Sequence, residues 1–106
     1  PSDLAPLQAA VANVHAAAPL IDYVQALVEA TRQDAAYVHG LSPRAALALL
    51  AAARAWAFID RRDAVLPEDV QAVFGSVAAH RLRRAQGSGH ASGDDLIALM
   101  RRIPLP

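Results

Sequence analysis

The stretch from residue 40 to residue 57 constrains the fold more than any other part of the chain. It reads GLSPRAALALLAAARAWA and would place apolar side chains on nearly every face of a helix. The hydroxyl of Ser42 can cap that helix, and Pro43 falls in the first turn, where its missing N–H is not needed. One stripe cannot hold all these apolar residues, so we expect neighbouring helices to cover this one on several sides and to bury Trp56 and the Leu47–Leu50 turn.

Composition restricts the chain to one helical domain. A length of 106 residues allows a single core that buries roughly two-thirds of the unfolded surface. Alanine accounts for much of the 55% hydrophobic fraction, and the aromatic fraction is only 5%, so helices must pack closely on helices. We expect an all-α bundle of four to five helices over residues 1–106, with at most short β pieces. Because the chain opens on Pro-Ser-Asp, we also expect it to be part of a longer protein.

The spacing of apolar residues predicts four helices besides the central one. Short extended pieces are expected near Val14 and His80, and the composition QGSGHASG predicts a flexible loop at residues 86–93. The expected helices run from Ser2 or Asp3 to about Val11, from Pro19 to about Arg32, from Pro43 to about Asp60, from Pro67 to about Ala79, and from Asp94 to before Pro104.

Charge and residue usage argue against several classes of function. Ten arginines balance ten acids, so nothing in the net charge favours nucleic acid or an anionic membrane as a partner. The absence of cysteine excludes disulfides, thiolate catalysis and the usual structural zinc sites. The four histidines lack the spacing of a helical metal motif, so we expect no metal site. No apolar run reaches the ~18 residues that cross a bilayer, and we expect a cytoplasmic protein.

Three groups of polar residues favour structural roles. Glu68 and Asp69 are adjacent and point apart on a helix, so they suit the positive end of its dipole better than acid–base catalysis. The arginines at 81, 83 and 84 have no interleaved aromatic residues and fit a solvated face better than a nucleic-acid site. Ser42 has no base nearby in sequence and no G-x-S-x-G motif, so hydrolase chemistry is unsupported.

Arg44 is the candidate functional residue. A cation in the first turn of a helix meets the positive end of the dipole, which costs a few tenths of a kcal/mol up to about 1 kcal/mol. Two interpretations stay open: an arginine that reaches the surface or pairs with an acid, or one held rigidly to contact a phosphate. The chain has no G-x-x-x-x-G-K-[ST] loop, so if Arg44 contacts ATP, the rest of the site lies elsewhere.

Four segments of the chain stand out together: DYV at 22–24 followed by Thr31-Arg32, GLSPRA at 40–45, RDAVLPEDV at 62–70 and HRL at 80–82. In their order and spacing they resemble the C-terminal helical lid domain of the MoxR-type AAA+ ATPases. The resemblance covers roughly residues 20–84. It implies that Arg44 is the sensor-2 arginine, which reaches the γ-phosphate of ATP and couples hydrolysis to movement of the lid, with Ser42 and Pro43 beside it at the nucleotide.

The resemblance also implies partners and cofactors. ATP and Mg²⁺ would bind the full-length protein, whereas this chain alone, without a phosphate loop or Mg²⁺ ligands, should not hydrolyse ATP. The implied partners are the protein's own AAA+ core, neighbouring subunits of a hexameric homo-oligomeric ring, and a protein with a von Willebrand factor A domain. The implied role is that of a chaperone in protein maturation or metal-cofactor insertion. Two alternatives are a free-standing helical protein-interaction module and a small nucleic-acid-binding domain.

The chain departs from the family pattern at two positions. Arg61 replaces the glycine that family members tend to have before the Arg-Asp pair, and Ala64 replaces an aromatic residue after it. Glycine most easily adopts the left-handed conformation at a helix exit, so the central helix must end without it.

Overall fold

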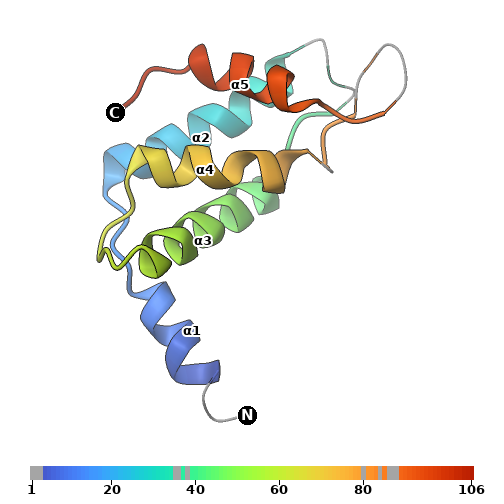
Figure 1. Cartoon of the computed structure of the whole chain (residues 1–106). Helices are drawn as coiled ribbons and strands as arrows, with labels where there is room; N and C mark the ends of the chain where they lie inside the picture. Colours follow the sequence, from blue (N-terminus) through green and yellow to red (C-terminus); the bar gives the residue numbers. More distant parts are fainter. Residues whose placement is uncertain (1–3, 35–36, 38, 80, 84, 86–88) are drawn as a thin grey trace.

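The helices form an irregular bundle with one projecting arm (Figure 1). The computed structural model describes residues 4–34, 37, 39–79, 81–83, 85 and 89–106. Within them lie α1 (Leu4–Ala12), α2 (Ala18–Gln33), α3 (Pro43–Ile59), α4 (Pro67–Ala78) and α5 (Gly93–Arg101). The described residues form no sheet; isolated bridges join His15 to Ala64 and Arg83 to His90. The predicted all-α class is confirmed, with the expected β pieces reduced to these bridges; His80 itself lies outside the described residues.

Helix α3 is central and has neighbouring helices on more than one side, but its fully buried side chains are few. It packs chiefly against α4 and also against α2 and α1. Its buried residues recur every four positions as a single narrow stripe: Ala45, Leu49, Ala53 and Ala57. Three of these four side chains are alanine, so the neighbouring helices can approach closely, while large apolar side chains outside the stripe, such as Ile59, stay exposed. The expectation that Trp56 and the Leu47–Leu50 turn are buried was therefore wrong in part, because Leu47 is 70% and Trp56 49% exposed and Leu50 is half-buried.

Helices α2 and α4 supply most of the large side chains of the core. Helix α2 buries one stripe of side chains, to which Tyr23 contributes an aromatic ring. On α4, the aromatic ring of Phe74 is fully buried among valines. The buried apolar residues of the two helices are Leu20, Tyr23, Val24, Leu27, Val28, Val70, Val73, Phe74, Val77 and Ala78.

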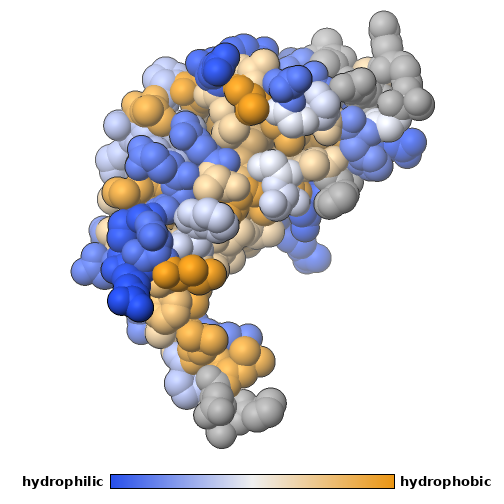
Figure 2. Space-filling model, in the orientation of Figure 1, coloured by the Kyte–Doolittle hydropathy of each residue, from blue (hydrophilic) through white to orange (hydrophobic). Residues whose placement is uncertain are grey.

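Helix α1 projects away from the other four helices as an arm (Figure 1). It contributes no buried residue, and the apolar side chains of Leu4 and Leu7 are about half exposed. Figure 2 shows apolar surface along this arm. Its link to α2 is anchored at His15, whose N–H donates to the Asp63 carbonyl (2.8 Å) and whose carbonyl accepts from the Val65 N–H (2.8 Å). The arm is thus attached through its C-terminal end.

Helix α5 begins earlier than predicted. Its N-cap is Ser92, whose Oγ accepts from the Asp95 N–H (3.2 Å), while the Asp95 carboxylate accepts from the Ser92 N–H (3.0 Å). This reciprocal capping box places Gly93 in the helix, so the expectation that Asp94 begins the helix and that Gly93 is loop was wrong. The rest of the predicted loop falls partly on residues 86–88, which lie outside the described residues.

The C-terminal end of α3 confirms the expected difficulty at Arg61. This residue adopts a φ of 61°, the left-handed conformation that favours glycine. The Arg61 N–H donates to the Phe58 carbonyl (3.0 Å) and the Arg62 N–H to the Ala57 carbonyl (2.9 Å). These two bonds are those of the Schellman motif, with arginine at the position that glycine usually holds.

Candidate functional site

The candidate site is the start of α3, and its backbone is built as the sequence predicted. Ser42 is the N-cap, with extended backbone angles (φ −76°, ψ 163°), and its Oγ accepts from the Ala45 N–H (3.2 Å). Pro43 occupies the first helical position, where no N–H is required. Arg44 follows directly, so the capped turn holds its Cα in a defined place.

The side chain of Arg44 is exposed and unpaired. Among the residues that the structure describes, no carboxylate lies within ion-pair distance of its guanidinium, and no hydrogen bond ties it down. Most other arginines of the described chain have such partners: Arg32, Arg54, Arg62, Arg81 and Arg102 each donate to a carbonyl or a carboxylate. Pairing with an acid therefore does not explain why Arg44 lies at the unfavourable end of the α3 dipole.

A groove of about 630 Å³ runs beside this turn, between α2 and the start of α3. Pro43 and Leu47 line it from α3, and Asp22 and Glu29 line it from α2. The two acids make the groove a poor match for phosphate, and Arg44 is not among its lining residues. Arg32 also lines the groove, but its Nε donates to the Leu41 carbonyl (2.9 Å) and its guanidinium pairs with Glu29 (3.6 Å). The described residues therefore bring Ser42, Pro43 and Arg44 together without an unpaired cation in the groove.

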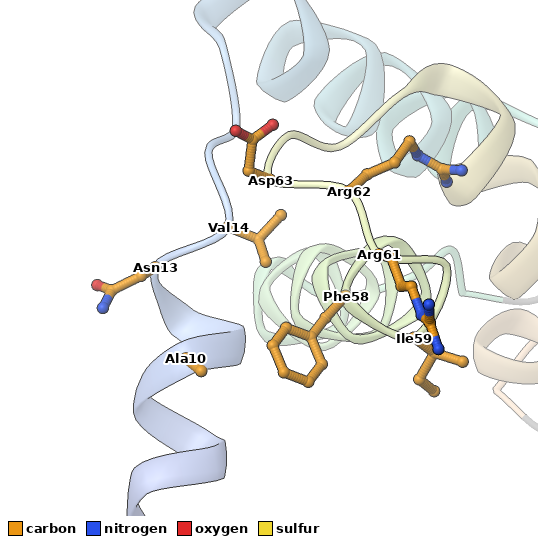
Figure 3. Close-up of a pocket in the computed structure, with 8 residues that line it drawn as sticks. All are labelled: Ala10, Asn13, Val14, Phe58, Ile59, Arg61, Arg62 and Asp63. Carbon is orange, nitrogen blue, oxygen red and sulfur yellow. The ribbon is translucent and has the colours of Figure 1, made fainter.

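A larger cavity, of about 1000 Å³, lies between α1 and the C-terminal end of α3. Figure 3 shows that Phe58 and Val14 face the space between the two helices, whereas Asn13, Arg62 and Asp63 point in different directions away from it. Diverging polar groups cannot act together on one substrate, so this cavity is no catalytic site. Nor do three or more His, Cys, Asp or Glu side chains of the described chain gather where they could hold a metal ion.

Asp69 has a structural role that the sequence did not reveal. Its side chain is 1% exposed, forms an ion pair with Arg62, and accepts from the Leu66 N–H (2.7 Å). Arg62 also pairs with the exposed carboxylate of Asp60. The sequence feature that could have predicted this role is Leu66 at the N-cap of α4. The leucine side chain has no oxygen to cap a helix, and an acid three residues later can accept a hydrogen bond from the N–H of the N-cap residue. This cluster joins the end of α3 to the start of α4.

The chain belongs to the AAA lid domain family, whose sequence model matches residues 29–99. The match includes the start of α3 with Ser42, Pro43 and Arg44 and the Arg62–Asp69 pair. None of the helices in the described part of the chain is both long and apolar enough to cross a membrane.

Similar proteins include MoxR proteins and a solved structure. The chain is 40% identical to chaperone MoxR1 of Mycobacterium tuberculosis over 89 residues, covering 76% of this chain and 24% of that protein. It is 42% identical to protein MoxR of Paracoccus denitrificans over 83 residues, 66% of this chain and 24% of that protein. A crystal structure from Cytophaga hutchinsonii, of a protein provisionally named an ATPase, matches with a TM-score of 0.81 and 30% identity over 91% of this chain and 33% of that one.

The uncharacterized protein YeaC of Bacillus subtilis is also similar, at 38% identity over 76 residues, which are 72% of this chain and 24% of that protein. The chain thus spans about a quarter of the length of the curated relatives that it matches. The likeness to MoxR proteins agrees with the resemblance noted in the sequence.

Proposed function

We propose that this chain is the lid of an ATP-binding and ATP-hydrolysing MoxR-type AAA+ ATPase and that Arg44 is its sensor-2 arginine. The observation that carries this proposal is the exposed, unpaired guanidinium at the capped first turn of α3, inside the segment matched by the lid family. In this role Ser42 and Pro43 hold the turn that presents Arg44 to the nucleotide.

The chemistry of Arg44 suits a phosphate. Guanidinium offers a rigid fork of donors that matches phosphate oxygens. A positioned arginine stabilises the charge that builds up on the transferred phosphoryl group. An acid partner within the lid would neutralise it, and the described residues provide none.

The remaining parts of the ATPase site belong to the proposal as well. The phosphate loop and the Mg²⁺ ligands would come from an AAA+ core in the same polypeptide, so the lid alone is inactive. The full protein would act in the cytoplasm as a hexameric ring in which the lid contacts neighbouring subunits. The similarity to chaperone MoxR1 supports a chaperone role. Its action in protein maturation or metal-cofactor insertion, and a von Willebrand factor A domain protein as partner, belong to the proposal through the resemblance to the MoxR type alone.

The test is ATP hydrolysis by the full-length protein with and without Arg44→Ala. We expect turnover to fall by roughly 100-fold or more, as is typical when a positioned donor to the transferred phosphoryl group is removed, with an unchanged melting temperature. Arg101→Ala is the matched control, because Arg101 is also an exposed helical arginine for which the described residues provide no partner. Equal turnover of wild type and Arg44→Ala would contradict the sensor role.

A protein-interaction module is the second candidate function. It is favoured by the exposed apolar residues of α1 and α3, which include Leu4, Leu7, Trp56 and Ile59. The two candidates separate in the same assay: an interaction module retains full turnover after Arg44→Ala and loses partner binding after Trp56→Ala.

A further inference from the structure

The connection between α2 and α3 is tied to the last turn of α2 by a buried hydroxyl. Thr31 is fully buried, and its Oγ1 donates to the Val28 carbonyl (2.6 Å) and accepts from the Leu41 N–H (2.8 Å). A threonine in a helix often satisfies its hydroxyl on the preceding turn alone. Here the same oxygen also holds the backbone of a residue ten positions later.

A second hydrogen bond holds the carbonyl of the same residue, Leu41. The Nε of Arg32 donates to the Leu41 carbonyl (2.9 Å), so both backbone polar groups of Leu41 are bound by adjacent residues of α2. The Leu41 side chain is buried as well. Leu41 is therefore held by its N–H, its carbonyl and its packing.

Gly40 permits this close approach. A Cβ at this position would overlap the Cα and backbone N of Arg32, so any other residue must push the connection away from α2. We call Thr31, Arg32, Gly40 and Leu41 the Leu41 clasp. It fixes the chain immediately before the Ser42 cap, three residues before Arg44.

The Leu41 clasp and the Ser42 cap constrain different features: the position of the chain relative to α2, and the first turn of α3 itself. The Ser42 cap orders the first turn within α3, but it does not set where that turn lies relative to α2. In the clasp, the backbone of Leu41, just before α3, is hydrogen-bonded to two side chains of α2. These contacts help to set the position of the start of α3 relative to the end of α2, and they do not involve the Arg44 side chain.

We propose that Thr31, Arg32 and Gly40 are positioning residues for Arg44, holding the first turn of α3 where its guanidinium can contact the nucleotide phosphate. This inference rests on the proposed sensor role of Arg44. A shift of about 1 Å in a positioned group can cost up to 100-fold in rate. The clasp therefore acts on turnover without touching the substrate.

The test uses the full-length protein and compares three clasp variants with a rescue variant, a matched control and a stability control. Thr31→Val removes the acceptor for the Leu41 N–H at nearly constant shape, Arg32→Met keeps the aliphatic stem but removes Nε, and Gly40→Ala forces the connection outward. Thr31→Ser keeps the hydroxyl and is the rescue variant. Glu29→Gln is the matched control for Arg32→Met, because it removes the Glu29–Arg32 ion pair (3.6 Å) while the bond to Leu41 stays.

We expect Thr31→Val and Arg32→Met to lower kcat by about 10-fold, with little change in the KM for ATP and with faster hydrogen exchange at residues 41–45. Thr31→Ser and Glu29→Gln retain turnover near wild type. In the Arg44→Ala background, Thr31→Val causes no further loss, because both changes remove the same contact. Val77→Ala, a destabilising change in the core of α4, controls for a loss that follows from lower stability alone.

The two proposals fail in different ways. One outcome is that Arg44→Ala abolishes turnover, whereas Thr31→Val and Arg32→Met keep wild-type turnover despite faster hydrogen exchange at residues 41–45. In that case the clasp proposal is wrong and the sensor role stands. The same conclusion follows if Thr31→Val lowers turnover by an equal factor in the wild-type and Arg44→Ala backgrounds. If Arg44→Ala leaves turnover unchanged, the sensor role fails and the positioning role fails with it. Should Gly40→Ala fail to fold, the other two variants still decide.

Discussion

Arg62 at the exit of α3 pairs with the buried carboxylate of Asp69 in the first turn of α4, so one ion pair joins the two helices that pack most extensively. The same carboxylate accepts from the Leu66 N–H, which leucine at the N-cap cannot satisfy. Asp69 therefore closes the α3–α4 connection and caps α4 with a single side chain.

Asp69→Ala should lower the free energy of unfolding by about 2–4 kcal/mol, because it leaves a partly buried guanidinium and a backbone N–H without their partner. Urea denaturation of the 106-residue chain followed by circular dichroism measures this loss. Glu68→Ala is the control: Glu68 is exposed in the same turn and contributes only to the helix dipole, which predicts a loss below about 1 kcal/mol. Equal losses for the two variants would contradict the role given to Asp69.

Arg61→Gly should stabilise the chain by about 0.5–1 kcal/mol. A left-handed conformation costs a non-glycine residue about 1–2 kcal/mol, and the greater freedom of glycine in the unfolded state offsets part of the gain. Arg101→Gly is the matched control, since Arg101 lies within α5 and the same replacement there should destabilise by up to about 1 kcal/mol. Denaturation curves of the two variants should shift in opposite directions, and a destabilised Arg61→Gly chain would overturn the prediction.

Leucines on the buried and the exposed sides of α3 should differ in how much stability the chain loses when they are replaced by alanine. Leu49 is 0% exposed, so Leu49→Ala should cost about 2–5 kcal/mol through lost burial and a residual cavity. Leu47→Ala, at 70% exposure, should change stability by less than about 0.5 kcal/mol. Leu50→Ala should fall between them, since Leu50 is half-buried. Thermal melts rank the three variants, and a large loss at Leu47 would show that its face is covered in solution.

Removal of α1 should leave the rest of the fold intact. Deleting residues 1–12 removes no buried side chain among the described residues 4–12 and should lower the free energy of unfolding by no more than about 2 kcal/mol. Deleting residues 1–16 also removes buried Val14 and both hydrogen bonds of His15, and we expect a further loss of about 2–4 kcal/mol. If the shorter deletion already unfolds the chain, the arm contributes more than its exposure indicates.

The sequence predicted the helices well because their ends carry chemical signals. Ser42 with Pro43 marked the start of α3, Pro67 marked that of α4, and the missing glycine at Arg61 marked a strained exit that the structure contains. The start of α5 was harder, because Ser92 and Asp94 can both cap a helix. Only the backbone geometry selects Ser92.

Burial on α3 could not be predicted from its pattern. An alanine-rich helix with leucine and tryptophan on every face has no polar side to reveal where neighbours are absent, so the exposure of Leu47 and Trp56 depends on how α2 and α4 pack. At the candidate site, the sequence placed Arg44 at a helix start. The lack of a partner for its guanidinium, and the Leu41 clasp beside it, depend on distances between separate elements.

Helix α3 has a mechanical consequence for the arm. It is one unbroken helix of 17 residues, which is about 25 Å long. Arg44 lies in its first turn, and α1 packs near its last turns, where Ala10 and Phe58 line the same cavity. If α3 tilted as one rigid body, Arg44 and the base of α1 would move together, and the projecting α1 would carry the largest displacement at its far end.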